Sequence, residues 1–305
     1  MLETILVASD LSAASDTLVR CAAGLGRLGA RRALLVHALC MRHYRDMRPV
    51  VEPLVAPRLR AQAEMLERAG LEVTTEVLPG QACEEILHAA ARCSAGCIVM
   101  ATRSGSLIHD WLTGSTVLRV LGKAARPVLV LQAREDDPNW SCCRQTGAWL
   151  GDHILHPTDF SDASERAFSI VRGLAAQGAA RVSLLHVQPP AHKNRPGWRE
   201  ESDQLDAARL SRLASELKAS GRAQVEGILR EGAAAEEILR AAGELGATMI
   251  VMGTQGHGVA HEVFLGSVSH HVLRHAPVPV LLAPPAAALR SQEPAAAEAT
   301  EGESR

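Results

Sequence analysis

Aromatic residues are scarce in this chain of 305 residues, where Phe, Tyr and Trp together account for 3%. Because 47% of the residues are nevertheless hydrophobic, Val, Ile, Leu and Ala must fill the core. The formal net charge is only −2, which argues against a protein that binds nucleic acid or membrane surfaces electrostatically. No apolar run is long enough to span a bilayer, and the first residues are expected to enter a strand, not a signal peptide.

Cysteine patterns typical of zinc sites or disulfide frameworks are also missing. The seven cysteines include no Cys-x2-Cys pair; Cys142 and Cys143 are adjacent, and Cys93 and Cys97 straddle a predicted helix-to-strand boundary. Scattered cysteines in odd number, with no export signal, are typical of a reducing compartment. The sequence therefore predicts a cytoplasmic protein.

The chain contains two copies of one domain. Residues 5–15 (ILVASDLSAAS) match residues 154–164 (ILHPTDFSDAS) at an offset of 149, obtained as 154 minus 5. Further on, GQACEEILHAA from Gly80 matches GAAAEEILRAA from Gly232, an offset of 232 minus 80, or 152. The three extra residues fall between the second strand and the third helix of the copy, where a loop can absorb them. A length of 305 residues suits two domains of ordinary size.

Strands and helices alternate in the first copy. Apolar runs predict strands at residues 4–9, 33–39, 71–78, 96–101 and 127–131. Helices are predicted from the cap candidates at 12–15 to Gly29, and at 58–69, 81–93 and 111–123. The segment 40–57 holds three prolines, which predicts a loop.

The second copy repeats this order. Strands are predicted at residues 154–157, 182–187, 223–229, 248–252 and 278–282, and helices at 163–176, 200–219, 233–245 and 268–275, with a Pro-rich loop at 189–197. Alternating strands and helices favour parallel pairing through right-handed crossovers, an α/β fold. We predict domains at residues 1–132 and 152–283, a linker at 133–151 and a disordered tail at 284–305, which lacks apolar periodicity.

A glycine-rich stretch follows the fourth strand of the second copy. Residues 252–258 (MGTQGHG) and the later Gly266-Ser267 form the pattern Gly-x2-Gly-x9-Gly-Ser. Glycines at such a place can adopt positive φ and turn backbone N–H groups toward a ligand, and the helix that follows Gly266 has a first turn that attracts anions. The alternative is a strand-to-helix turn with no ligand, in which Ser267 lies near the N-cap.

Three stretches of the second copy are expected to meet at the carboxyl edge of the sheet: Pro157-Thr158-Asp159, Val187 and the glycine-rich stretch. Asp159 can accept a hydrogen bond from a ribose hydroxyl, or instead cap the following helix, a role that Ser161 or Asp162 can also fill. The backbone at Val187 can pair with a base edge. Gly256, Gly266 and Ser267 are expected to hold phosphates.

The sequences ILHPTDFS, LLHV and Gly-x2-Gly-x9-Gly-Ser together resemble the universal stress protein family, and the duplication resembles its tandem members, over residues 2–132 and 152–283. The resemblance implies two Rossmann-like, doubly wound domains with parallel five-stranded sheets of order 3-2-1-4-5, paired as a pseudo-dimer through their fifth strands. It also implies a site for ATP, with or without Mg. The positions that match the site of ATP-binding members are Pro157, Thr158, Asp159, Val187, Met252, Gly253, Gln255, Gly256, Gly266, Ser267, Val268 and Ser269.

The first copy departs from the family pattern. Ala101 and Ser104 stand in place of Gly253 and Gly256, and Ser9 and Ala38 replace Thr158 and Val187, while Asp10, Gly114 and Ser115 are kept. A Cβ at residue 104 narrows the approach to phosphate, although Gly105 could shift the turn by one residue and Arg103 could add a charge. We expect this copy to complete the pair structurally, and leave open whether it binds nucleotide.

Histidines offer a separate hypothesis. His271 and His275 are spaced i, i+4 on one predicted helix, with His257, His261 and His270 nearby, and such a pair can ligate zinc. No cysteine or carboxylate lies at a matching spacing, so we expect surface or core histidines here and assign no metal ligand. His37 and His186 each end the second strand of a copy and are expected to pack and form hydrogen bonds, not to catalyse.

The sequence thus predicts a cytoplasmic stress-response regulator or sensor that binds ATP, or a related adenine nucleotide, in its second copy. No Gly-x4-Gly-Lys-Ser/Thr loop, nucleophile–base pair or carboxylate metal pair is present, so no catalytic residue is assigned and at most slow ATP hydrolysis is expected. The alternatives are a scaffold that acts only through protein partners, and a weak ATPase or zinc-binding protein. Two tandem chains could associate further as a homodimer; no nucleic-acid or membrane partner is expected.

Overall fold

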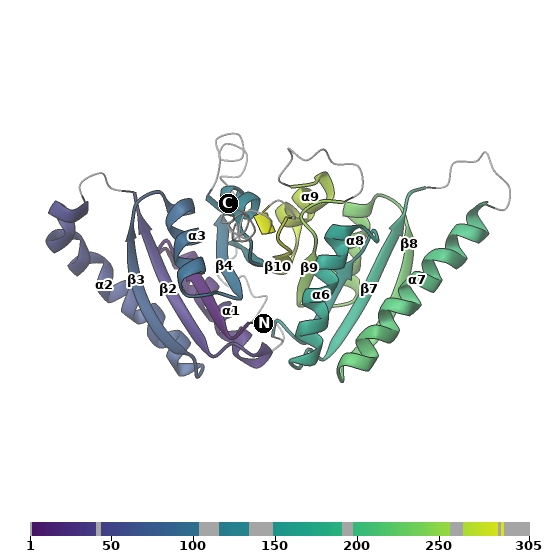
Figure 1. Cartoon of the computed structure of the whole chain (residues 1–305), viewed down its shortest axis with the longest axis horizontal. Helices are drawn as coiled ribbons and strands as arrows, with labels where there is room; N and C mark the ends of the chain where they lie inside the picture. The colour runs from purple at the N-terminus through teal and green to yellow at the C-terminus, as the bar shows by residue number, and fades with distance from the viewer. Residues whose placement is uncertain are drawn as a thin grey trace, which may run out of the picture.

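Two α/β halves lie side by side and share a single ten-stranded sheet (Figure 1). The computed structural model describes residues 2–40, 44–103, 116–133, 149–190, 198–256, 265–285 and 288–289. The two halves meet at the central strands of the sheet, and the long helices α2 (Tyr44–Arg68) and α7 (Trp198–Ser220) form its outer flanks (Figure 1).

Within the first half, strands and helices alternate as predicted. Its strands are β1 (Thr4–Ala8), β2 (Arg32–Leu39), β3 (Glu72–Pro79), β4 (Cys97–Arg103) and β5 (Val128–Ala133). Its other helices are α1 (Ala13–Ala23), the 3₁₀ helix η1 (Gly24–Leu28), α3 (Ala82–Arg92) and α5 (Thr116–Lys123). The predicted helix at 111–123 lies only partly within the described residues, because 111–115 fall outside them.

The second half repeats the pattern. Its strands are β6 (His153–Pro157), β7 (Arg181–Gln188), β8 (Gln224–Glu231), β9 (Met249–Met252) and β10 (Val280–Leu282). Its remaining helices are α6 (Asp162–Ala176), α8 (Ala234–Glu244) and α9 (Ser267–His275).

The strand order is β3-β2-β1-β4-β5-β10-β9-β6-β7-β8, which is 3-2-1-4-5 in each half, as expected. Pairing is parallel inside each half, and the halves join through the antiparallel pair β5–β10. At this junction Leu129 faces Leu281, the residue 152 positions later (129 + 152). Equivalent residues of the two copies therefore meet at the centre, as in a two-fold dimer made within one chain.

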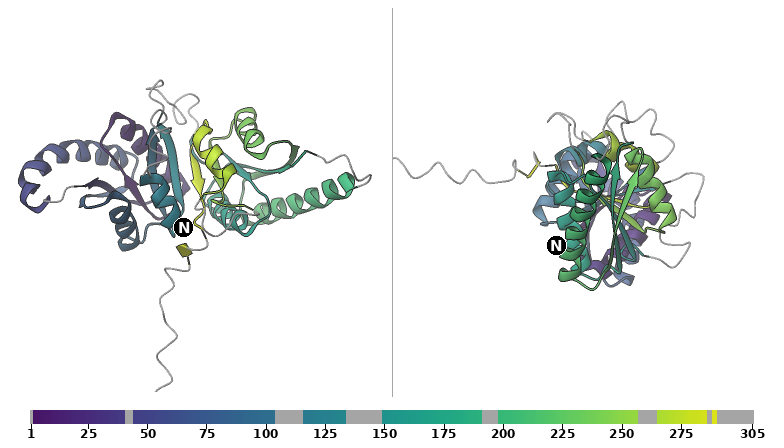
Figure 2. Two further views of the ribbon diagram at one scale, coloured as in Figure 1. Left: turned by 90° about the horizontal axis from the view of Figure 1, so that it is seen from above. Right: turned by 90° about the vertical axis from the view of Figure 1, so that its right-hand side faces the viewer.

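Helices cover both faces of the sheet (Figure 2). One apolar core lies under α1, α2, α6 and α7, and a second lies on the opposite face under α3, α5, α8 and α9. Each core contains residues from both halves, and aliphatic side chains dominate it, as the scarcity of aromatic residues requires. The halves also touch where η1 and α6 end, since a Cβ on Gly29 would lie 2.7 Å from Oε1 of Gln177.

The prediction of a loop at residues 40–57 is wrong, because α2 begins at Tyr44 and includes all three prolines. Pro49, Pro53 and Pro57 are spaced by four residues, so they share one helix face, and all three are exposed. Each proline removes an N–H that would bond to the carbonyl four residues earlier. These carbonyls lie on the exposed side, where water can satisfy them, and the later turns of α2 are anchored by buried residues such as Leu59 and Leu66.

The ends of the predicted linker and the start of the predicted tail are ordered. Leu150 is buried, and the Arg27 guanidinium lies 5.0 Å from the ring centroid of Trp149. Pro284, predicted to begin a disordered tail, accepts a hydrogen bond at its carbonyl from Nε of Arg166 (3.2 Å), and Ala288 is buried. Residues 134–148 and 290–305 lie outside the described part of the chain.

Candidate functional site

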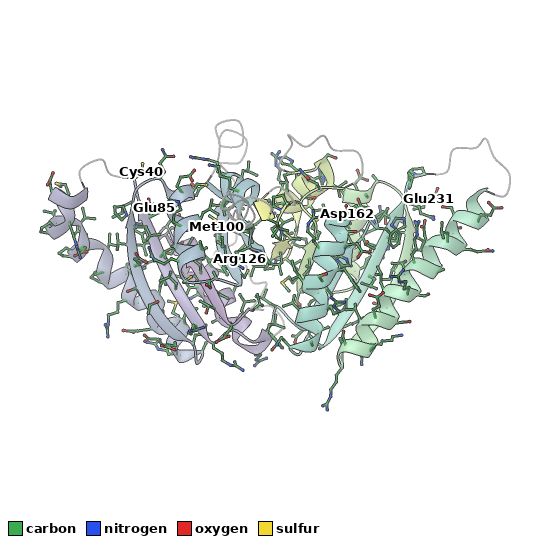
Figure 3. All side chains as sticks on the ribbon, in the orientation of Figure 1. Cys40, Glu85, Met100, Arg126, Asp162 and Glu231 are labelled. Carbon is green, nitrogen blue, oxygen red and sulfur yellow. The ribbon has the colours of Figure 1, made fainter. Side chains whose placement is uncertain are left out.

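A cavity of about 230 Å³ opens at the carboxyl ends of β6, β7 and β9 in the second half. Glu231, the last residue of β8, and Asp162, the first of α6, are labelled in the upper part of the second half in Figure 3 and show where this edge of the sheet lies. The lining includes all twelve of the predicted site residues, Pro157, Thr158, Asp159, Val187, Met252, Gly253, Gln255, Gly256, Gly266, Ser267, Val268 and Ser269. The structure thus brings together residues that are more than 100 positions apart in the sequence.

The position of the cavity follows from the sheet topology. The chain runs outward from β6 through β7 to β8 and then returns to β9 on the other side of β6. The connections on the two sides of β6 leave in opposite directions, and such a switch point leaves a crevice beyond the strand ends. Pairing of β6 with β9 stops at Leu155 and Ile250, short of the cavity.

Four lining residues were not predicted: Ser164, Leu185, Ala234 and Ile238. Leu185 precedes Val187 by two positions and so lies on the same face of β7, and Ala234 and Ile238 are spaced i, i+4 on α8. Strand and helix periodicity in the sequence therefore contained this signal. Leu185, Ala234 and Ile238 add apolar surface to the lining, while Asp159 and the glycine-rich stretch supply polar groups.

Asp159 is turned toward the glycine-rich stretch. Its Oδ1 accepts hydrogen bonds from the N–H (3.0 Å) and Oγ (2.5 Å) of Ser161, which is the N-cap of α6. Its Oδ2 faces Gly256 so closely that a Cβ on this glycine would lie 2.5 Å away. The helix cap is thus Ser161, and Asp159 supports it with one oxygen while the other lies at the cavity.

Gly253 and Gly256 are needed for close approach and not for positive φ, which corrects our prediction. Gly266 has φ −66°, and neither Gly253 nor Gly256 is among the glycines with positive φ. A Cβ on Gly253 would lie 2.9 Å from the backbone C and O atoms of Ala163 in the first turn of α6. Glycine at residue 253 therefore lets α6 begin directly against the end of β9.

Backbone strain in the strand-one loop occurs at a non-glycine residue. Phe160 has φ 61° and its counterpart Leu11 has φ 59°, which costs about 1 kcal/mol or more for a bulky side chain. The N–H of Phe160 donates to Oγ1 of Thr158 (3.1 Å), and that of Leu11 donates to Oγ of Ser9 (3.0 Å). The sequence carries no signal for this conformation, which both copies share.

The histidine near the end of the second strand of each half forms a hydrogen bond to this loop. His186 Nδ1 donates to the carbonyl of Thr158 (2.7 Å), and His37 Nδ1 donates to that of Ser9 (2.8 Å). A carbonyl can only accept, so the proton must reside on Nδ1 in both rings. The ring of His186 also packs 4.6 Å from that of Phe160. The expectation that these histidines pack and form hydrogen bonds is confirmed.

Helix α9 begins at the cavity with an open first turn. Its N-cap is Gly266, which makes no side-chain cap bond, and no acidic residue lies in the first turn. Ser267, expected near the N-cap, is the first helical residue and is exposed, while Ser269 Oγ donates to the carbonyl of Gly253 (2.9 Å). The unpaired N–H groups and the positive end of the helix dipole make this turn suitable for an anion.

The first half differs at the matching place. Oδ1 of Asp10 accepts from the N–H of Ser12 (2.9 Å) and Oγ of Ser15 (2.5 Å), and Ser9 Oγ donates to Oε1 of Gln62 in α2 (2.6 Å). Ala101 carries the Cβ that Gly253 lacks. The remaining predictions for this half concern Ser104, Gly105, Gly114, Ser115 and the side chain of Arg103, which lie outside the described residues.

The histidine pair on α9 makes local contacts. The rings of His271 and His275 are 4.3 Å apart, and Nδ1 of His275 pairs with the carbonyl of His271 (2.9 Å). Burial, with the neighbouring Arg274, lowers the pKa of His270. Within the described ranges, no three His, Cys, Asp or Glu side chains are grouped so as to hold a metal ion. His257 and His261 are not among these residues.

A buried histidine lies beside the cavity. His156 in β6 has no exposed surface, and burial lowers its pKa to about 4 from the ordinary 6.5. Its Nδ1 donates to the carbonyl of Val251 (2.8 Å), and its ring lies 5.9 Å from that of Phe168. The folded protein therefore keeps this ring neutral at physiological pH.

We predict that His156 makes stability fall in mild acid. Its folded-state pKa lies below the unfolded value, so its contribution is complete above pH 6.5 and is lost as the pH falls toward 4. The shift corresponds to a loss of about 2 kcal/mol between pH 7 and pH 4.5. Urea unfolding of the wild type and of His156→Val at both pH values measures it. Equal losses in the two proteins would show that other groups cause the acid sensitivity.

Comparison with known proteins gives one consistent result. The model of the universal stress protein family matches residues 1–132 and 151–284. A universal stress protein of Mycolicibacterium smegmatis is 28% identical over 308 residues, covering 92% of this chain and 97% of its own. A universal stress protein of Thermus aquaticus is 36% identical over 132 residues, which is 42% of this chain and 96% of its own.

The fold agrees with these relationships. A universal stress protein structure from Archaeoglobus fulgidus superposes with a TM-score of 0.64 at 22% identity, covering 92% of this chain and 96% of the other. No helix in the described part of this chain is long and apolar enough to cross a membrane. The chain belongs to the universal stress protein family and carries two copies of its domain in tandem.

Proposed function

We propose that the second half binds ATP, or a related adenine nucleotide, in the cavity beyond β6, β7 and β9, and that the chain acts as a stress-response sensor or regulator. The observation that carries this proposal is the arrangement of opposite kinds of surface around one cavity. The lining combines apolar side chains with the carboxylate of Asp159 and the open first turn of α9. A nucleotide has matching parts: a base that packs on apolar surface, a sugar with hydroxyl groups and an anionic phosphate end.

The size of the cavity suggests how a nucleotide would lie. Sites that enclose a whole drug-sized ligand measure roughly 300–1,000 Å³. A volume of about 230 Å³ suits the base and the ribose, with the phosphates lying over the glycine turn. We assign the base to the wall that contains Val187 and Ile238, a ribose hydroxyl to Asp159, and the phosphates to the backbone N–H groups of Gly256 and Ser267.

A magnesium ion is compatible with this arrangement when the nucleotide brings it. Mg²⁺ prefers oxygen ligands and keeps several waters, with one or two carboxylates and substrate phosphates as the others. Asp159 is the one carboxylate among the described lining residues. The chain itself would therefore supply little of the coordination.

The cavity is better suited to binding than to phosphoryl transfer. Its described lining contains neither lysine nor arginine, the groups that neutralise charge on a transferring phosphoryl. We therefore propose a binding protein with at most slow hydrolysis, located in the cytoplasm. The five cysteines whose structure is described, Cys21, Cys40, Cys83, Cys93 and Cys97, are all free, which suits a reducing compartment.

We predict that ATP stabilises the folded chain. At a free ATP concentration of about 100 times Kd, the free energy of unfolding should rise by roughly 2.7 kcal/mol. Thermal unfolding with and without ATP and Mg²⁺ measures this change. An unmoved transition at millimolar ATP would contradict the proposal and favour a scaffold that acts through protein partners alone.

A further inference from the structure

The pairing between the first and fourth strands ends one residue earlier in the second half than in the first. In the first half the register runs from Ile5↔Cys97 through Val7↔Val99. In the second half it contains only Ile154↔Met249 and Leu155↔Ile250. The missing third pair would join residues 156 and 251, directly at the edge of the cavity.

A proline accounts for the missing pair. In a parallel ladder of this register, the next hydrogen bond would run from the N–H of residue 157 to the carbonyl of Val251. Pro157 has no N–H, whereas its first-half counterpart, Ala8 (8 + 149 = 157), has one. Val251 is fully buried, so its carbonyl would lose a partner and water could not replace it.

His156 supplies the replacement. Its Nδ1 lies 2.8 Å from the carbonyl oxygen of Val251 and must donate, because a carbonyl only accepts. The ring is fully buried, and its other nitrogen, Nε2, has no hydrogen-bond partner. The bond to Val251 is therefore the one polar contact of this side chain. The first half has Val7 at this place, where the backbone of Ala8 can donate and no side-chain donor is required.

We propose that His156 is a positioning residue of the nucleotide site, matched to Pro157. Pro157 ends the ladder early, so that β6 and β9 separate where the cavity begins. His156 donates to the carbonyl of Val251, which this separation leaves without a backbone partner. Pro157 itself lines the cavity, and Asp159 follows two residues later. In the first half, Val7 and Ala8 let the pairing of β1 with β4 continue one residue further. The two halves therefore differ at this edge of the sheet. The binding part of this inference rests on the proposed function; the structural part does not.

Thermal unfolding of four nucleotide-free proteins tests the structural part: wild type, His156→Val, Pro157→Ala and the double variant. His156→Val, which introduces the first-half residue, should lower the melting temperature by about 5 °C, because a buried acceptor loses its donor. In the Pro157→Ala background the same substitution should cost less than half as much, since an alanine there supplies the N–H that proline lacks. The cavity left by valine is common to both backgrounds and cancels in the comparison. Equal costs in both backgrounds would overturn the pairing of His156 with Pro157.

ATP titration of His156→Val and His156→Asn tests the positioning role. Asparagine keeps an N–H donor near the place of Nδ1, so it should retain wild-type affinity, while valine should weaken ATP binding about fivefold or more. Unchanged ATP affinity in His156→Val, despite its lower melting temperature, would overturn the positioning role. A wild-type protein that binds no nucleotide would overturn the proposed function instead, and the four-protein comparison would still decide the structural claim.

Discussion

Replacing Gly256 with valine should abolish measurable ATP binding, with an affinity loss of about 100-fold or more. A Cβ at this position would lie 2.5 Å from Oδ2 of Asp159, so the carboxylate must turn away from the place that we assign to the ribose. The added methyl groups also occupy space that the phosphates require. Two contributions are lost together: a hydrogen bond to a charged group, and the close approach of the backbone to an anion.

Folding should survive this substitution, which is what makes it informative. The atom that a Cβ meets is the end of a flexible side chain, and Gly256 is exposed, so the free energy of unfolding should change by less than about 1 kcal/mol. Gly243→Val provides the matched control, because Gly243 is exposed on α8 and a Cβ there has no atom within 4 Å. Gly243→Val should bind ATP like the wild type. If Gly256→Val bound ATP as tightly as the wild type, the glycine turn would not be part of the binding site.

Replacing Gly253 with alanine should lower the free energy of unfolding by about 2–3 kcal/mol. Here the added Cβ would lie 2.9 Å from backbone atoms of Ala163, which cannot move unless the first turn of α6 moves away from β9. That turn carries Ser161, which holds Asp159 in place, so ATP binding should weaken as well. Urea denaturation and ATP titration measure the two effects.

The first half supplies the opposite substitution as a control. Ala101→Gly removes the Cβ at the matching position of β4 and should cost only about 0.5–1 kcal/mol, the usual effect of glycine inside a strand. If Gly253→Ala cost no more than Ala101→Gly, the contact between β9 and the start of α6 would not be what requires glycine at residue 253.

Much of the fold could be predicted because local patterns and the duplication agree. Each strand and α-helix described in one copy has a counterpart in the other, and the observed strand order repeats in both halves. The main error was α2, where the steric rule against proline in helices was applied without knowing which side of the segment faces solvent. Solvent exposure of the freed carbonyls is a tertiary property, so the sequence alone does not reveal it.

The candidate site was likewise predictable only in part. Its lining was predictable, because the ends of parallel strands must meet and the motif residues lie at those ends. The reason for each residue was less predictable. Glycine at 253 is explained by the backbone of Ala163, and the strain at Phe160 is held by Thr158 and His186. The contacts of Gly253 with Ala163 and of His186 with Thr158 join elements that are far apart in the chain, and residue spacing carries no record of them.

Calorimetric titration of ATP and Mg²⁺ into the wild-type chain, beside Gly256→Val, tests the central claim most directly. The account predicts saturable binding in the wild type that includes one site per chain in the second half, and loss of that site in the variant. No binding by the wild type, or the same isotherm for both proteins, would contradict it.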